Sequence, residues 1–394
     1  MPDLRELLTR EAEGLDVPAP PTGDVLSRGK GVRRRRRVVA GAAAVAAAAV
    51  VGGAAVLGLG GGSDTDLDTA GMPEPMVGPV FTVGTTLYYG DALDTAEIDD
   101  KAVKSIFYTS AGVVVRHGDN SASDGGGPQR FSLVQEDGRV TRLDLVTEDT
   151  VHATDSDQPY VAYGENVDGT LEVVLYDVAA DREAARVDVG PTSEGWFPVS
   201  LDGDTIFVMN GYEGAVKVVD WRTGDVSASE VLSSVWEAHG GYLGDHEDDV
   251  PVVRDGRTGE VVLRGPAGGG YFEVSPDGRY AGLVDEEAEM DGEQPGYVVY
   301  DIATGSSVTI DGMAFDFGWT PDSDLFKVED DLVTTCDTAT GSCTETEVDL
   351  PEGVGEIPMG TTCRSVVGKP GSVCDEPSGP QPPEVRLGGR SYES

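Results

Sequence analysis

A short phrase, D-x-x-T-G, returns four times in the second half of the chain and constrains its fold more than any other feature. Its copies begin and end at Asp220 and Gly224, Asp255 and Gly259, Asp301 and Gly305, and Asp337 and Gly341. A fifth copy without the glycine, residues 177–181, precedes them, and the mean interval is 40 residues. We expect a tight hairpin at each copy, because the Asp carboxylate accepts from turn amides and Gly tolerates a positive φ. A period near 40 is typical of one four-stranded propeller blade.

A second phrase precedes these hairpins and marks an earlier turn of the same unit. Its sharpest copy is S-P-D-G-R-Y at residues 275–280, and weaker copies occupy residues 154–157, 200–204 and 320–324. Aromatic residues recur once per unit just before these turns, at Trp196, Phe197, Tyr271, Phe272 and Trp319, with Trp236 at the matching place in the unit that lacks the phrase. We expect them to pack one blade on the next. An aromatic platform for a ligand is the alternative.

The two phrases together resemble those of bacterial β-propellers of the WD40-like and TolB-like kind. Blades of that group carry S-P-D-G-[RK]-x followed by Y-D-x-x-T-G, and residues 275–280 with residues 300–305 match the pattern best. The resemblance spans roughly residues 100–350, while the GH and WD pair of true WD40 repeats is missing. It implies an all-β propeller architecture and no particular activity.

The repeats predict six units, at residues 100–147, 148–190, 191–232, 233–265, 266–312 and 313–350. Residues 81–89 and 357–367 together can complete a seventh, which would join the two ends of the domain and remove free sheet edges. We therefore predict a propeller of seven four-stranded blades over residues 80–370, with six blades as the alternative. Residues 371–394, rich in Pro and Gly, are expected to form a flexible tail.

A basic block and an apolar run near the N-terminus predict a membrane anchor. Residues 38–60 are almost entirely Ala, Val and Gly, and they follow directly on Arg33, Arg34, Arg35, Arg36 and Arg37. An apolar stretch of about 20 residues spans a bilayer as a helix, and cytoplasmic flanks carry the excess of Lys and Arg. We expect a cytoplasmic tail over residues 1–37, a transmembrane helix over 38–60, a linker over 61–79 and an extracellular propeller. A cleaved signal peptide is the alternative.

The charge balance limits the partners of the outer domain. Nine of the 28 basic residues and six of the 71 acidic residues lie in residues 1–37, so the rest carries 19 basic and 65 acidic residues, a net charge near −46. Such a surface repels nucleic acid and anionic lipid. The expected partners are a protein, a peptide or a glycan at the cell envelope, besides the bilayer itself.

All four cysteines lie in the C-terminal part of the chain, at Cys336, Cys343, Cys363 and Cys374. An even number of cysteines in an oxidising compartment predicts disulfides. Cys336 and Cys343 flank a hairpin turn, so their side chains are expected to meet across neighbouring strands, and Cys363 with Cys374 would close a second loop. A four-cysteine zinc site is the alternative, although the C-x₂-C spacing is absent.

The sequence contains no strong catalytic motif. Nucleophile-elbow, zinc-protease and phosphate-loop patterns are missing, so we name no catalytic residue and expect no enzyme activity. His239 and His246, with Asp245 and Asp248, form a weak metal candidate on an expected acidic loop. We expect no cofactor, and Asp-rich turns leave Ca²⁺ as a weak possibility because none has the EF-hand pattern.

Three functions remain open at this stage. The first is a membrane-anchored, non-catalytic propeller that binds or scaffolds a protein, peptide or glycan. The second is a propeller-type hydrolase or lyase with an acidic or Ca²⁺-assisted site in its channel. The third is a transmembrane sensor that signals through residues 1–37. The fold alone cannot choose among them.

Overall fold

A computed structural model describes residues 76–121, 127–148, 150–211, 214–233, 235, 238–267, 270–285, 296–351, 363–365, 372–374 and 384–390. All of them belong to one compact unit, residues 68–394. The basic tail with Arg33–Arg37 and the apolar run over residues 38–60 lie outside the described residues, so the anchor stays a prediction. Within the described ranges, no helix is long and apolar enough to cross a membrane.

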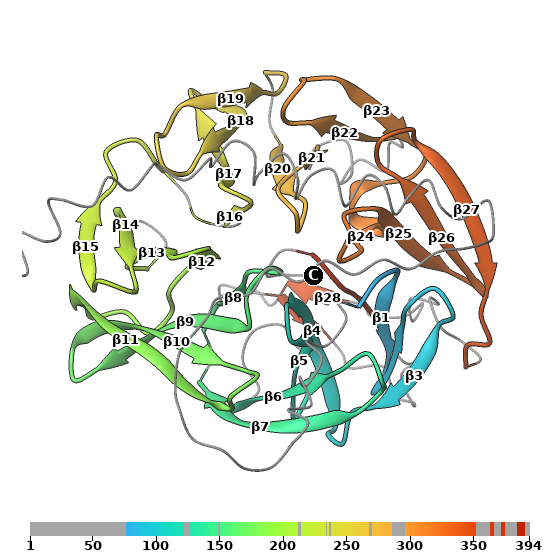
Figure 1. Ribbon diagram of the computed structural model, residues 1–394, viewed down its shortest axis with the longest axis horizontal. Coiled ribbons are helices and arrows are strands. Elements are labelled where there is room, and N and C mark those ends of the chain that lie inside the picture. The colour runs from blue at the N-terminus through green and yellow to red at the C-terminus, as the bar shows by residue number, and fades with distance from the viewer. Residues whose placement is uncertain are drawn as a thin grey trace, which may run out of the picture. The chain divides into compact units, whose positions relative to one another are not determined.

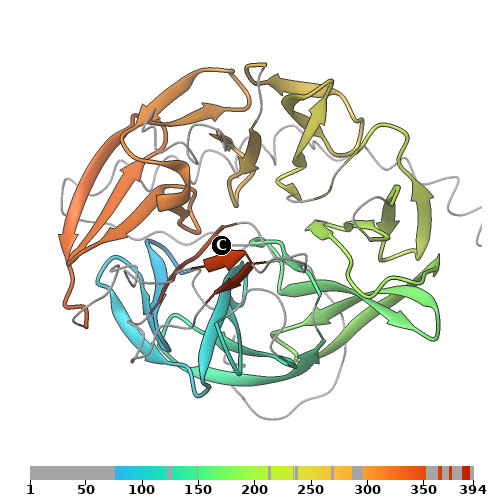
Figure 2. The ribbon, with the colours of Figure 1, turned by 180° about the vertical axis from the view of Figure 1, so that it is seen from behind.

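Seven antiparallel sheets of four strands form a ring (Figures 1 and 2), and its centre, where the innermost strands of several blades line a pocket, is called the central channel below. In six of these sheets the first strand in sequence lies nearest the centre of the ring and the fourth lies at the periphery (Figure 1). Six blades are continuous in sequence: β4–β7 (Ala102–Thr109, Gly112–Gly118, Gln129–Val134, Val140–Thr147), β8–β11 (His152–Thr154, Tyr160–Val167, Thr170–Asp177, Arg182–Pro191), β12–β15 (Val199–Asp202, Thr205–Met209, Val216–Asp220, Asp225–Ala228), β16–β19 (Ala238–His239, Tyr242–Glu247, Val250–Asp255, Val261–Arg264), β20–β23 (Tyr271–Val274, Tyr280–Val284, Tyr297–Asp301, Ser307–Ile310) and β24–β27 (Gly318–Trp319, Leu325–Glu329, Leu332–Asp337, Ser342–Glu347). Each falls within its predicted unit to one residue, and the seven-blade prediction is confirmed.

The seventh blade joins the two ends of the domain. It consists of β1 (Val80–Val83), β2 (Thr86–Tyr89), β3 (Asp94–Glu97) and β30 (Val385–Leu387), and β30 pairs antiparallel with β1. Figure 1 shows the red end of the described chain beside its blue start. In the register of this pair, Thr82 lies opposite Arg386. The chain is therefore closed by its own C-terminal segment, which supplies the innermost strand of the blade.

This closure corrects two predictions about the C-terminal region. Among the described residues, the strand that closes the ring on β1 is β30 and does not come from residues 357–367, of which residues 363–365 form β28 (Cys363–Ser365), paired with β29 (Ser372–Cys374). The range 371–394 is not all tail, because it contains β30. The reason is that Val385 and Leu387 pack against the hydrophobic core between the last and first blades. At the other end, Met76 of the predicted linker is already buried in the domain.

Seven hydrophobic clusters hold the ring together, one between each pair of neighbouring blades. The cluster that closes the ring brings Phe81 and Tyr88 of the first blade against Phe326 and Val333 of the last. Because every blade packs on two neighbours, both faces of each sheet are covered. The predicted packing role of the recurring aromatics is met by Phe197, Phe272 and Trp319, each buried in such a cluster, whereas Trp236 lies outside the described residues.

The D-x-x-T-G phrase forms the hairpin between the third and fourth strands of a blade. In the copy at Asp301, Oδ1 accepts hydrogen bonds from the amide (2.9 Å) and the hydroxyl (3.0 Å) of Thr304. Gly305 has φ +68° and donates its amide to the carbonyl of Asp301. The copies at Asp255 and Asp337 repeat this pattern. At Asp220 the amide of Thr223 donates to the carboxylate, while its hydroxyl donates to Asp225. Gly224, Gly259 and Gly341 all have positive φ. In the degenerate copy, Asp181 takes the glycine's place with φ +51°.

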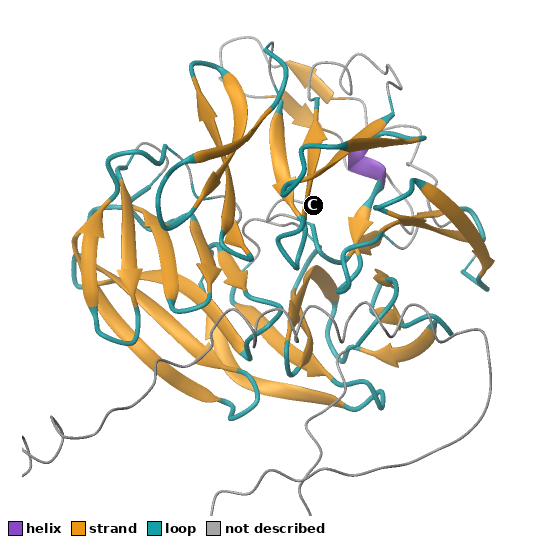
Figure 3. Cartoon of the chain, turned by 45° about the horizontal axis from the view of Figure 1, so that its top comes forward, coloured by secondary structure: helices purple, strands orange, loops and turns teal. Residues whose placement is uncertain are grey.

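The earlier turn phrase links neighbouring blades. Asp155 accepts a hydrogen bond from the amide of Gly203 in the next blade (2.8 Å), and Asp202 accepts one from Gly241 in the blade after that (3.1 Å). These turn carboxylates are therefore engaged by backbone groups of the ring. One 3₁₀ turn, η1 (Ala314–Asp316), precedes β24 (Figure 3).

Candidate functional site

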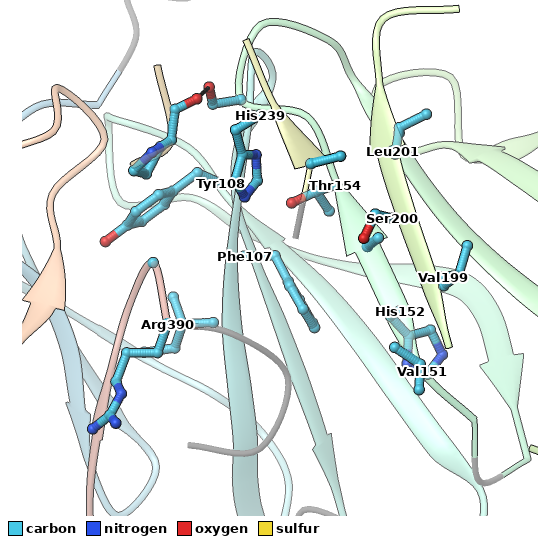
Figure 4. Close-up of a pocket in the computed structure, with 16 residues that line it drawn as sticks. Phe107, Tyr108, Val151, His152, Thr154, Val199, Ser200, Leu201, His239 and Arg390 are labelled. Carbon is cyan, nitrogen blue, oxygen red and sulfur yellow. Dashed lines mark hydrogen bonds between the residues drawn. The ribbon is translucent and has the colours of Figure 1, made fainter. Parts of the chain in front are cut away.

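A pocket opens at the central channel, over the innermost strands of four neighbouring blades. It is lined by residues of β4, β8, β12 and β16, by Pro276 of the turn after β20, and by Gly389 and Arg390 after β30 (Figure 4). The cavity between these side chains has a volume of about 60 Å³. Ligand sites of propellers and other ring-shaped folds lie in such places, because several elements present side chains toward one space.

Most hydroxyl groups around the pocket are engaged by the protein itself. Ser156 donates to the carbonyl of Pro276 (2.9 Å), and Tyr108 donates to the carbonyl of Trp319 (2.7 Å). Ser200 donates to the carbonyl of Val235. These bonds fix the inner strands relative to one another, and they leave histidines as the main groups with remaining hydrogen-bonding capacity.

His152 is the least solvated of these histidines and has an unmet hydrogen bond. It is 3 % exposed, and its Nε2 lies 2.9 Å from the hydroxyl of Thr147. Its Nδ1 is buried with no hydrogen-bond partner among the described residues. Burial, with the nearby positive charge of Arg116, holds its pKa well below the usual value. His152 is therefore a neutral imidazole at neutral pH.

His239, at the end of β16, lines the same pocket from another blade. Burial lowers its pKa, although the carboxylates of Asp155 and Asp277 act in the opposite direction. Two neutral imidazoles beside apolar side chains such as Val151 and Leu201 are suited to hydrogen bonding with an uncharged polar group. Arg390 shares the pocket through its backbone side, and its guanidinium points away from both histidines (Figure 4).

Ser132, His117 and Asp100 form a second cluster, which has the hydrogen-bond arrangement of a catalytic triad but is buried between two blades. The Nδ1 of His117 lies 2.6 Å from Asp100, and its Nε2 lies 2.9 Å from the hydroxyl of Ser132. His117 is fully buried and Ser132 is 3 % exposed, so this hydroxyl cannot meet a substrate in the observed conformation. Arg130 binds both carboxylate oxygens of Asp100 at 2.7 Å.

The charges of this cluster indicate a structural role. Burial raises the pKa of Asp100, but the hydrogen bonds from Arg130 and His117 outweigh it and leave the pKa well below its usual range. Burial lowers the pKa of His117 despite its bond to Asp100. Asp100 lies in the connection from β3 to β4, so the cluster ties that connection to β5 and β6.

The predicted disulfide between Cys336 and Cys343 is formed, and the two residues lie opposite each other in the register of β26 and β27. In β28 and β29 the backbone register places Cys363 opposite Cys374. The bond between this second pair stays a prediction.

The structure places the two histidines of the weak metal candidate, His239 and His246, in different surroundings. His239 lines the channel pocket, whereas His246 on β17 has its Nε2 at 2.8 Å from the carbonyl of Gly270. Asp245 is buried and forms a salt bridge with Arg254 at 2.7 Å. Across the described ranges, no group of three or more His, Cys, Asp or Glu is arranged to hold a metal ion.

Sequence reasoning missed His152, Arg390 and the cluster around His117. The sequence did contain a signal for His152. The turn phrases place residues 152–154, 199–201 and 238–239 at equivalent positions on innermost strands, where they line the channel. No comparable signal marked the cluster around His117, whose members come from three separate segments.

No protein-family model matches the chain, and no curated protein matches it. Among solved structures it is similar to TolB from Acinetobacter baumannii, with 11 % identity, 70 % of this chain and 64 % of that chain covered, and a TM-score of 0.37. It is also similar to a functionally unknown protein from Desulfotomaculum acetoxidans (11 % identity, 69 % and 99 % covered, TM-score 0.40) and to the C-terminal WD40 domain of Sif2 (11 % identity, 70 % and 76 % covered, TM-score 0.39). The chain thus spans slightly less than two thirds of the TolB chain. These likenesses concern the fold alone, and the propeller is established by the order of its sheets and its seven cores.

Proposed function

We propose that this chain is a non-catalytic binding or scaffold module that holds a protein, peptide or glycan in its central channel. In this proposal residues 38–60 fix it in the cell membrane and the propeller faces outward, with residues 1–37 in the cytoplasm. The length of the apolar run, the arginine block before it and the disulfide between Cys336 and Cys343 support that placement.

The observation that carries the binding role is the unmet hydrogen bond of His152 beside the channel pocket. A buried polar atom without a partner costs about 1–3 kcal/mol, and a ligand that supplies the partner recovers that cost on binding. Apolar side chains around it provide contact area without charge. An uncharged amide or hydroxyl group, as found in peptides and glycans, matches this chemistry.

Peptides displayed on phage and a glycan array test the proposal with the full-length chain in mild detergent. Two variants probe the pocket: His152→Phe keeps the ring volume but removes both nitrogens, and Ala153→Trp fills the channel. Ala339→Trp, on an exposed hairpin, is the matched control. We expect ligands that bind the wild type and the control but neither channel variant. Ligands that bind all four proteins equally, or no ligand from either library, would refute channel binding.

The proposed topology has its own test. Externally added protease should digest the propeller of intact cells stripped of their wall and leave residues 1–37 protected. N-terminal sequencing of the membrane-bound protein should recover those residues. A mature protein that begins after residue 60 would show that the apolar run is a cleaved signal peptide.

A further inference from the structure

A second pocket lies beside the closing strand and has an unusual charge. It is formed by residues of β25, β30 and η1 together with Arg390, and its cavity volume is about 280 Å³. Three cations line it, Lys327, Arg386 and Arg390, against two acidic residues, Asp316 and Glu329. The whole chain has 71 acidic and 28 basic residues, so a pocket with an excess of positive charge runs against its composition.

Arg390 supplies a charge that no residue in the described part of the chain compensates. Lys327 forms a salt bridge with Glu329 (2.9 Å), and Arg386 forms one with Glu384 (2.7 Å). Arg390 donates from Nη1 to the carbonyl of Phe315, and it makes no salt bridge with any residue that the structure describes. A guanidinium that is partly removed from water without a counter-ion attracts an anion.

Both arginines that line the pocket also have a donor without an acceptor. The Nε atoms of Arg386 and Arg390 are buried and have no acceptor among the described residues. The side chain of Arg386 is 13 % exposed, so bulk water does not readily take the place of that acceptor. An oxyanion can accept hydrogen bonds from Nε and Nη of one guanidinium at once, and these charge-assisted bonds are stronger than those to a neutral acceptor.

We propose that this pocket binds a small oxyanion, the carboxylate or phosphate group of a ligand, through Arg390 and Arg386 with Lys327 as a nearby positive charge. The site is independent of the channel site, because the guanidinium of Arg390 points away from His152 and His239 (Figure 4). Its cations come from β25 and from the C-terminal segment. The pocket therefore exists only in the closed ring, and an oxyanion bound there stabilises the closure.

Titration calorimetry and thermal unfolding of the full-length chain in detergent test this site, with sodium phosphate and sodium acetate as probes. Sodium chloride at equal ionic strength corrects for screening. We expect saturable binding of at least one probe and a rise of the unfolding midpoint that chloride does not produce. The probe that binds more tightly identifies phosphate or carboxylate as the preferred group. An equal midpoint in all three salts, without heat of binding, would overturn the proposal.

Variants locate the binding. Arg390→Gln and Lys327→Met remove one charge each, while Arg257→Gln removes an exposed cation from a hairpin far along the sequence. We expect affinity to fall at least tenfold in the first two and to stay unchanged in the third. Lys327→Met gives the answer if Arg390→Gln fails to fold. Ala153→Trp should retain oxyanion binding, which separates this site from the channel. Unchanged affinity in Lys327→Met and Arg390→Gln would contradict the assignment.

Discussion

Replacement of Gly389 by alanine should weaken the closure of the ring. Gly389 is the second residue after the closing strand and has φ +65°; a Cβ atom there would lie 2.4 Å from the carbonyl oxygen of Trp319 and 2.8 Å from its Cβ. The left-handed conformation costs an L-residue about 1–2 kcal/mol, and overpacking adds about 1–3 kcal/mol. Alanine also restricts the unfolded chain, which returns about 0.4–1 kcal/mol. The expected net loss of unfolding free energy is about 2–4 kcal/mol.

Gly305→Ala is the matched control for this substitution. Gly305 has a similar φ of +68°, but its added Cβ would meet no atom within 4 Å. Gly305→Ala should therefore lower the free energy of unfolding by only about 1 kcal/mol, which is the cost of the left-handed conformation minus the gain from restricting the unfolded chain. Urea unfolding of the full-length chain, followed by tryptophan fluorescence, measures both losses. Equal losses in the two variants would refute the reasoning, because they would show that Gly389 is not packed against Trp319.

Three further predictions concern stability. Burial lowers the pKa of three histidines in the folded protein: His117, His152 and His239. Below the histidine pKa of the unfolded chain, near 6.5, the unfolded chain therefore binds more protons than the folded protein. The free energy of unfolding should fall as the pH drops from 7.5 to 5.5, by up to about 1.4 kcal/mol per histidine. Urea midpoints at the two pH values check this, and a flat profile would exclude three buried neutral imidazoles. Joint replacement of Cys336 and Cys343 by alanine should cost up to about 2.5 kcal/mol from the small loop they close, whereas an unchanged denaturation midpoint would show that the bond adds nothing to the hairpin. Asp301→Ala removes the acceptor of the Thr304 amide and should cost about 0.5–1.5 kcal/mol in the same assay, and a neutral effect would mean that Gly305 alone sets the turn.

The blades could be located from the sequence because their turns are made by local chemistry. Asp301, Thr304 and Gly305 complete their hairpin within five residues, and the bonds depend little on the rest of the molecule. The same holds for the pair of cysteines across the next hairpin. A repeat of such turns therefore fixes the blade boundaries even where the strands between them diverge.

The closing strand could not be located in that way because its partner is distant in sequence. Val385 and Leu387 gain their ladder from β1 and their packing from β1 and β25, roughly 300 and 60 residues earlier in the chain. Three residues between prolines and glycines carry too little local preference to show a strand.

The candidate site was hidden for a related reason. The low pKa of His152 depends on burial between two blades and on Arg116 of the neighbouring blade, and its remaining hydrogen-bonding capacity depends on Thr147. The role of Arg390 in the second pocket depends on its hydrogen bond to the carbonyl of Phe315 and on the cations beside it. Such properties arise from tertiary contacts, so composition and spacing do not reveal them.

Closure of the ring by residues 385–387 is the claim on which both pockets depend, and hydrogen exchange tests it most directly. The amide of Gly388 donates to the carbonyl of Val80 (2.8 Å), and the amide of Gly84 donates to the carbonyl of Glu384 (3.0 Å). Exchange measured peptide by peptide should show residues 384–390 protected together with β1, on the timescale of the central strands of other blades. Exchange of residues 384–390 within seconds, beside a protected β2, would contradict the closed ring.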